Sequence, residues 1–167
     1  MALITCDWMH LIMACSIDIL ISGKKQSLLS PPTKRYLELV RPYAQVNMRI
    51  VKPLRLLNMS AETRLDRESE HLLQQAPPGC RLIGLTERGQ TFDSPQFAQW
   101  LVDNVQNKAR LGLLIGGAFG LSPSVLNRCD EKVSLSPLTF PHHIALMILV
   151  EQLYRAFTII RHHPYHK

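Results

Sequence analysis

Apolar residues in this 167-residue chain gather in short runs, which are separated by longer stretches with helical periodicity. Runs of branched or long apolar side chains, such as those that begin at Ile17 and Leu111, are typical of strands buried on both faces of a sheet. Such runs recur along the chain, and they predict β-strands at residues 17–22, 49–54, 81–86, 111–115 and 132–136.

Helices are predicted between these strands. Ser60 can cap a helix in which Leu65 and Leu72 share an apolar face, and Ser94 followed by Pro95 is typical of another helix start. The helical segments are expected at residues 32–43, at 61–76, from 94 onward, at 123–129 and at 141–160. This alternation indicates an α/β fold, with a mostly parallel sheet and helices on both faces.

The last predicted helix, at residues 141–160, is apolar on more than one face. Such a helix must be buried on several sides, either as the central helix of one chain or against a second subunit. Its apolar positions are Ile144, Ala145, Met147, Ile148, Leu149, Leu153, Ala156, Phe157 and Ile160.

Composition indicates a globular chain with an uneven surplus of positive charge. Hydrophobic residues make up 46% and charged residues 19%, which excludes a disordered chain. The net charge is +6, and residues 1–60 alone carry eight lysines and arginines against three carboxylates. This basic end suits a phosphate-bearing partner, although a modest excess of cations also serves to keep a surface soluble.

The cysteines and the N-terminal residues indicate in which cellular compartment the protein resides. The four cysteines have no CxxC spacing, and they are interpreted as reduced thiols of a cytoplasmic protein. Residues 1–22 are apolar but have no basic leader, and Asp7, His10 and Asp18 interrupt them. Neither a signal peptide nor a membrane span is therefore predicted.

Three loops that follow predicted strands are candidates for a ligand site, at residues 85–89, 116–120 and 135–140. Ligands of parallel sheets bind beyond the carboxyl ends of the strands, where such loops converge. The GGAFG sequence at residues 116–120 brings bare backbone toward a ligand, or else forms only a tight turn. A dinucleotide fingerprint is disfavoured, because GGAFG is not GxGxxG and it follows the fourth strand.

Five of the seven histidines fall within the last 26 residues of the chain. A zinc site is one interpretation, but no cysteine or carboxylate lies at a suitable spacing, and no metal is predicted. A disordered, tag-like tail is another. A third is a site for a substrate base, since Arg155 and Tyr165 accompany His142, His143, His162, His163 and His166.

Four motifs stand in order at the end of the chain: LLIGGAFGL at residues 113–121, LSPLTFPH at 135–142, EQLYRA at 151–156 and HPYHK at 163–167. Together they resemble the RlmH family of SPOUT (trefoil-knot) methyltransferases, which act on pseudouridine in 23S ribosomal RNA. The resemblance is strongest over residues 111–167 and continues more loosely through 17–25 and 82–89.

The resemblance implies an enzyme that uses S-adenosylmethionine to methylate N-3 of a pseudouridine in 23S rRNA, on assembled ribosomes. It also implies a C-terminal trefoil knot, which no argument from physical principles would predict because knots are so rare. The family pairs two subunits, so a homodimer is expected. Residues 1–16 have no counterpart and form an N-terminal extension, and residues 17–167 form a single domain.

Site residues follow from the matching positions. The implied cofactor-binding residues are Leu85, Gly116, Leu135, Ser136, Pro137, Leu138, Thr139 and Phe140. The implied catalytic residues are Arg155, which would bind phosphate or the developing anion, and His142, Tyr165 and His166, which would position the base. The proton acceptor is not assigned among them.

One departure from the family pattern concerns substrate binding. Many members carry an arginine four positions after the histidine of the Pro-His motif, where this chain has Leu146. Loss of that cation would weaken an RNA or dimer contact, and Lys24, Lys25, Arg128 or Arg161 could replace it. Leu146 therefore favours an alternative function, a ribosome- or RNA-binding dimer of the same fold without turnover.

Overall fold

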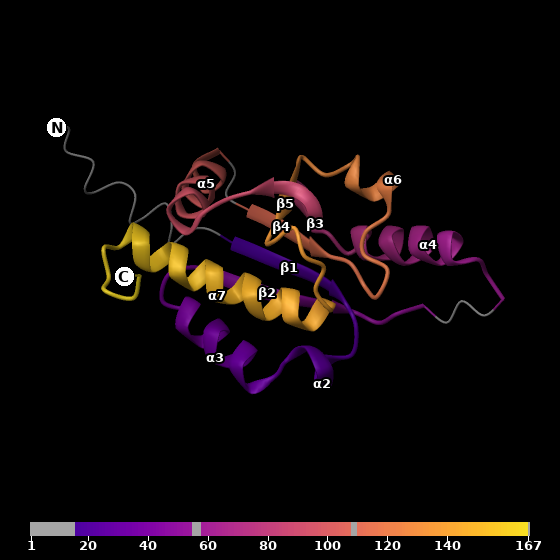
Figure 1. The fold of residues 1–167 in the computed structure, drawn as a ribbon, viewed down its shortest axis with the longest axis horizontal. Coiled ribbons are helices and arrows are strands. Elements are labelled where there is room, and N and C mark those ends of the chain that lie inside the picture. Colours follow the sequence, from indigo (N-terminus) through magenta and orange to yellow (C-terminus); the bar gives the residue numbers. More distant parts are fainter. Residues whose placement is uncertain (1–15, 55–57, 108–109, 167) are drawn as a thin grey trace.

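Five parallel strands form the centre of the protein (Figure 1). The computed structural model describes residues 16–54, 58–107 and 110–166. The strand order is β2-β1-β4-β3-β5, and all four neighbouring pairs are parallel. The strands are β1 (Ser16–Ser22), β2 (Gln45–Val51), β3 (Arg81–Thr91), β4 (Arg110–Ile115) and β5 (Glu131–Ser134). The predicted parallel sheet is confirmed.

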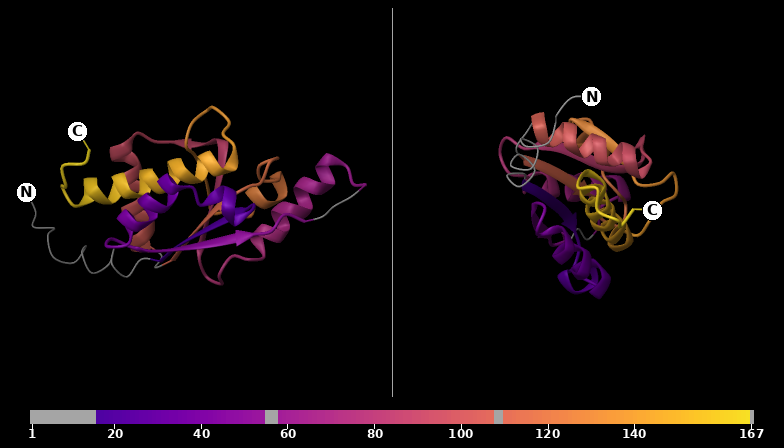
Figure 2. Two further views of the ribbon diagram at one scale, coloured as in Figure 1. Left: turned by 90° about the horizontal axis from the view of Figure 1, so that it is seen from below. Right: turned by 90° about the vertical axis from the view of Figure 1, so that its left-hand side faces the viewer.

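Helices cover both faces of this sheet, as predicted. Alternate residues of β1 separate the two faces: Ile19 packs in the larger core with α3, α5 and α7, whereas Leu20 packs in a smaller core with α4 and α6. Figure 2 shows α4 at the end of the molecule opposite the C-terminus. The helices are α2 (Lys25–Leu28), α3 (Pro31–Val40), α4 (Ala61–Leu73), α5 (Ser94–Asn107), α6 (Pro123–Leu126) and α7 (His142–Ile160).

All five strands differ from their predicted bounds by at least one residue, and β2 and β3 differ most. Strand β2 was predicted at residues 49–54, but it runs from Gln45 to Val51. It ends before Pro53, which has no N–H for a sheet ladder. The prediction for β3 ended at residue 86, but the strand continues through an irregularity between Leu85 and Gln90. Gly89 lies within this irregularity, where a Cβ would stand 2.5 Å from the carbonyl carbon of Val133. The short helix α2 was not predicted.

The long helix α7 is buried on several sides within one chain. It packs against α3, α5 and the sheet, and Leu146, Leu149, Leu153 and Phe157 are almost entirely enclosed. By length and composition α7 could cross a membrane, but its apolar character is explained by this central position. Leu146 has no exposed surface, so this side chain contributes to the core and reaches neither RNA nor a partner surface.

A buried ionic cluster joins three strands at the end of the sheet where β1 begins. The Asp18 carboxylate is fully buried, and it accepts hydrogen bonds from Arg49 Nε at 2.8 Å and from Arg110 Nε at 2.7 Å. Burial opposes ionisation of Asp18, but the bonds from Arg110 and Arg49 outweigh it and hold the pKa below its ordinary value. The cluster fixes β1 between β2 and β4.

The predicted extension at residues 1–16 lies outside the described residues except for Ser16, which begins β1. Two of the four cysteines lie in that part of the chain as well. The other two, Cys80 and Cys129, are free thiols, and burial raises the pKa of each. Their chemistry is therefore that of protonated thiols.

Candidate functional site

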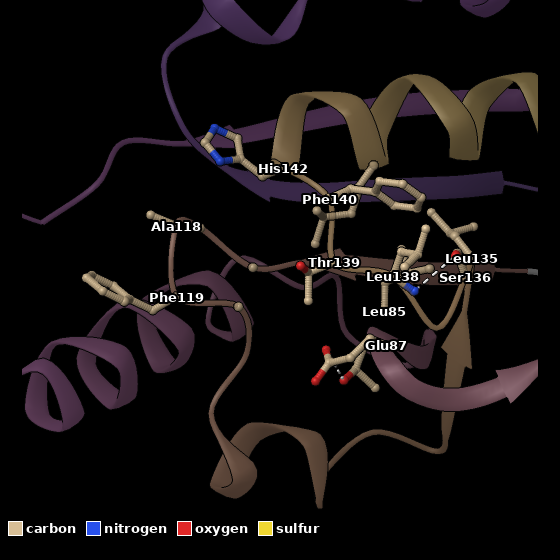
Figure 3. Close-up of a pocket in the computed structure, with 16 residues that line it drawn as sticks. Leu85, Glu87, Ala118, Phe119, Leu135, Ser136, Leu138, Thr139, Phe140 and His142 are labelled. Carbon is tan, nitrogen blue, oxygen red and sulfur yellow. Dashed lines mark hydrogen bonds between the residues drawn. The ribbon is translucent and has the colours of Figure 1, made fainter.

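A cavity of about 290 Å³ lies beyond the carboxyl end of β4, beside the irregular part of β3 and the start of α7. All three loops predicted to form a ligand site contribute to it, and Figure 3 shows their side chains around one hollow. The lining residues are Leu85, Thr86, Glu87, Ile115, Gly116, Gly117, Ala118, Phe119, Gly120, Leu135, Ser136, Leu138, Thr139, Phe140, His142 and Ala145.

The glycine loop is tightly closed. A Cβ at Gly116 would stand 2.1 Å from the carbonyl carbon and oxygen of Gly120, a separation that no side chain can adopt. Gly120 itself has φ of +80°, a conformation that favours glycine, and it donates a backbone hydrogen bond of 3.1 Å to Gly117. Gly117 is less constrained, since the nearest atom to its Cβ would be Glu68 Oε2 at 3.4 Å.

The loop between β5 and α7 is held by serine hydroxyls. Ser134 Oγ is 2.8 Å from the Ser136 carbonyl and 3.3 Å from the Glu87 carbonyl, while Ser136 Oγ accepts a bond of 3.0 Å from the Leu138 N–H. This arrangement leaves Leu138 71% exposed at the cavity. Seven of the eight predicted cofactor residues line the cavity. Pro137 lies in the same loop and does not line it.

Several lining residues were not predicted as site residues. Thr86 and Glu87 follow Leu85 directly, and Thr86 Oγ1 donates to Glu87 Oε2 at 3.2 Å. Glu87 supplies the single carboxylate among the described lining residues. Phe119, which is 57% exposed, comes from the glycine loop. The position of Phe119 in a loop after a strand was a usable signal, whereas Thr86 and Glu87 lie within the irregular part of β3 and Ala145 reaches the cavity because α7 begins there.

His142 occupies the first turn of α7 at the edge of the cavity (Figure 3). Its ring meets that of His143 edge to face, with centroids 5.8 Å apart. Burial, and then the charge of His143, lower the pKa of His142 below its ordinary value of 6.5. At neutral pH the imidazole is therefore uncharged, and it can accept a hydrogen bond or a proton.

The other predicted catalytic residues lie at the opposite end of α7. Arg155 is thirteen residues beyond His142, about 20 Å along a helix. Its Nε and Nη2 donate to Glu151 Oε1 at 3.1 and 2.5 Å. Tyr165 Oη donates to the same carboxylate oxygen at 3.1 Å, and Arg155 Cζ stands 4.9 Å from the Tyr165 ring centroid.

This cluster is largely satisfied within the chain. Tyr36 Oη stands 3.3 Å from Tyr165 Oη, and the Tyr154 ring packs edge to face on Tyr165 at 4.7 Å. Burial, and then the bonds with Tyr36 and Glu151, raise the pKa of Tyr165 above its ordinary value, so the phenol remains protonated. One chain therefore brings Arg155 and Tyr165 together but does not bring them to His142.

The terminal histidines are divided between the two ends of α7. His142 and His143 lie at its start, whereas His162, His163 and His166 are exposed residues after its end. Among the residues that the structure describes, no group of three His, Cys, Asp or Glu side chains is arranged to hold a metal ion.

Comparisons with known proteins agree with this architecture. Residues 15–166 match the family described as predicted SPOUT methyltransferase. Two similar proteins, each named ribosomal RNA large subunit methyltransferase H, come from Carboxydothermus hydrogenoformans and Gemmatimonas aurantiaca. The first is 37% identical over 157 residues, covering 90% of this chain and 99% of the relative. The second is 44% identical over 110 residues, covering 66% and 71%.

Solved structures support the same fold. A probable methylase family protein from Haemophilus influenzae superposes with a TM-score of 0.56 at 12% identity, over 93% of this chain and 71% of that one. A protein described in connection with 2-OH methylation of C/U34 on tRNA gives a TM-score of 0.51 at 16% identity, over 86% and 92%. At these identities the likeness concerns the fold alone.

Proposed function

The chain belongs to the SPOUT methyltransferases, in the family of ribosomal RNA large subunit methyltransferase H, and on this premise we propose its reaction. It transfers a methyl group from S-adenosylmethionine to N-3 of a pseudouridine in 23S rRNA, in the cytoplasm and on assembled ribosomes. The family resemblance seen in the motifs is confirmed. The observation that carries the proposal is the convergence of three predicted cofactor loops on one cavity.

The residues around the cavity suit S-adenosylmethionine. Leu85, Leu135 and Phe140 offer apolar surfaces for the two faces of adenine, whose edge can bond with main-chain groups of the loops. The Glu87 carboxylate suits the ammonium group or the ribose hydroxyls of the cofactor. Because Gly116 has no side chain, the closed glycine loop leaves space in the cavity for the rest of the cofactor. The cavity volume lies near the lower end of the range of about 300–1,000 Å³ for small-molecule sites.

Little chemistry is required of the protein beyond placement. When bound, the cofactor supplies an electrophilic methyl group on its sulfonium sulfur. N-3 of the pseudouridine would have to lose its proton to a proton acceptor in order to take up this methyl group. Neutral His142 lines the cavity, where it can accept a hydrogen bond from the pseudouridine ring. Arg155 would stabilise the anion that develops on the ring.

A homodimer would unite the two ends of α7. Within one chain Arg155 lies about 20 Å along α7 from His142, too far for both to act on one nucleotide. A second subunit whose α7 runs in the opposite direction would place its Arg155 beside the first subunit's cavity. We therefore include a homodimer with a shared active site in the proposed function.

The reaction is tested by incubating the protein with labelled S-adenosylmethionine and ribosomes that lack the modification, with protein-free 23S rRNA in parallel. Label on a pseudouridine, located by mass spectrometry of RNA fragments, is the expected result. Cofactor binding by calorimetry without any transfer would contradict the enzymatic function. Leu146, the residue that favoured a binding protein without turnover, lies in the core and no longer supports that alternative.

The shared site is tested by mixing two inactive variants. Gly116→Ala blocks the cofactor cavity, and Arg155→Ala removes the cation from the other end of α7. In a mixed dimer one of the two sites is intact, so about a quarter of the normal activity is expected when half of the dimers are mixed. No recovery after dissociation and reassociation of the subunits would contradict a shared site.

A further inference from the structure

A second hollow, of about 970 Å³, lies beside the cofactor cavity, and we name it the lysine cleft. It is formed where β1 ends, by the turn into α2, the first residues of α3 and the end of β2, elements that lie together in Figure 1. Its lining residues are Gly23, Lys24, Lys25, Gln26, Leu29, Lys34, Ile50, Lys52 and Pro53. The cleft is therefore the meeting point of segments far apart in the sequence.

The charge of the lysine cleft is of one sign and is not neutralised. Its four lysines are exposed, and no carboxylate is among the described lining residues. Within the described part of the chain, the ammonium groups of Lys24, Lys25, Lys34 and Lys52 form neither an ion pair nor a hydrogen bond. In contrast, the six ion pairs that the described residues form all use arginine. The four lysines thus remain available to an external anion.

The lysine cleft shares a wall with the cofactor cavity. Gly23 lines the cleft, His142 lines the cavity, and a Cβ at Gly23 would stand 3.3 Å from His142 Nε2. A molecule bound across this wall would span the two hollows. An extended polyanion in the cleft could therefore present one of its units to the cavity.

We propose that the lysine cleft binds the sugar-phosphate backbone of the RNA substrate beside the target nucleotide. This inference rests on the proposed function and assigns to the substrate a binding surface outside the cofactor cavity. Lysine ammonium groups act as point charges for phosphate without reading sequence, which suits positioning of a strand. Leu29, Ile50 and Pro53 give apolar contacts for sugars between the phosphates.

A second explanation accounts for only part of the cluster. Lysines on an edge strand discourage pairing with other sheets, and Lys52 directly follows the edge strand β2. Lys24, however, belongs to the turn after β1, which lies inside the sheet, while Lys25 begins α2 and Lys34 belongs to α3. Protection of the edge strand would not gather these lysines around one cleft.

The test compares two variants that each lose two positive charges. Lys24→Gln with Lys52→Gln removes charge from the lysine cleft, while Arg67→Gln with Lys132→Gln removes exposed cations from α4 and from β5 at the opposite sheet edge. The probe is a fluorescent RNA hairpin with pseudouridine in its loop, and its affinity is measured over a range of salt concentrations. Calorimetry with S-adenosylmethionine verifies that each variant retains the cofactor cavity.

We expect the cleft variant to bind the hairpin about tenfold more weakly and to lose about 1.5 from the slope of log affinity against log salt. The control should lose about twofold or less. Equal losses in the two variants would overturn the proposal, because they would reflect net charge alone. If the unaltered protein transfers no methyl group but the difference in RNA affinity persists, the proposed function fails and the lysine cleft stands.

Discussion

The two ends of α7 differ in how far their polar groups are satisfied. At its start, the cavity is lined by glycine backbone, apolar side chains and an uncharged His142, and Leu138 and Phe119 remain exposed. At its end, Arg155 and Tyr165 share the Glu151 carboxylate, and tyrosine rings enclose them. The start of α7 therefore borders an open cavity, whereas the polar groups near its end already bond with one another.

This difference separates two kinds of functional evidence. Open space with bare backbone indicates a ligand, because such a surface gains contacts only when something binds there. A cluster whose groups already bond with one another can have a purely structural role. Arg155 and Tyr165 fix the C-terminal tail on α7 through Glu151, and their part in the reaction belongs to the proposed function.

The largest effect is expected at the glycine loop. Gly116→Ala should weaken S-adenosylmethionine binding at least a hundredfold, because its Cβ would overlap the backbone of Gly120 and force the loop open. Gly117→Ala is the matched control, and it should change affinity less than about fivefold, since its nearest contact is 3.4 Å. Calorimetry measures both, and circular dichroism shows whether each variant folds. Similar losses in the two variants would contradict the role of the closed backbone.

A substitution near the C-terminal end of α7 should lower turnover and leave cofactor binding unchanged. Arg155→Ala is expected to lower kcat about a hundredfold, as loss of one charged donor to a developing anion does. Arg161→Ala is the control, because Arg161 also stacks on a tyrosine, with its Cζ 5.6 Å from the Tyr43 ring centroid. If Arg155→Ala lowers the melting temperature but not kcat, the cluster is structural and the comparison between the two ends becomes sharper.

Asp18 provides a reference for an ionic cluster with a structural role. Asp18→Asn should lower the free energy of unfolding by about 2 kcal/mol at pH 7, because the carboxylate bonds with two arginines. Its folded-state pKa lies below 3.8, so this stabilisation is present above pH 3.8 and is lost as pH falls toward the folded-state value. Urea unfolding at pH 7 and pH 3 measures the difference. Cofactor affinity should be unchanged at pH 7.

The smallest effect concerns the charge state of His142. His143→Gln removes a neighbouring charge that lowers the pKa of His142, so His142 should become protonated at a higher pH. A charged imidazole opposes the sulfonium, and cofactor affinity near pH 6 should fall by less than about threefold. His71→Gln on α4 is the control. An unchanged pH dependence of affinity in His143→Gln would show that His142 does not face the bound cofactor.

Much of the site could be predicted because its signals are local. Gly116 and the run from residue 135 follow β4 and β5, and parallel strands bring such loops to one edge, where Leu85 lies within β3 just before its irregularity. Glu87 was not predicted, because it lies within the irregular part of β3 and a single exposed carboxylate has no distinctive sequence pattern. The position of Leu146 could not be foreseen either, since most faces of α7 are apolar and periodicity cannot rank them.

By itself, the sequence determined the α/β class and the family and pointed to the three segments that line the cavity, because periodicity, strand-end glycines and ordered motifs act over a few residues. Only the tertiary structure decided which groups meet. It placed Tyr165 against Glu151 and Tyr36, and it gathered Lys24, Lys34 and Lys52 from three elements around one cleft. Distances between such residues depend on how helices pack on the sheet, and no spacing along the chain records that packing.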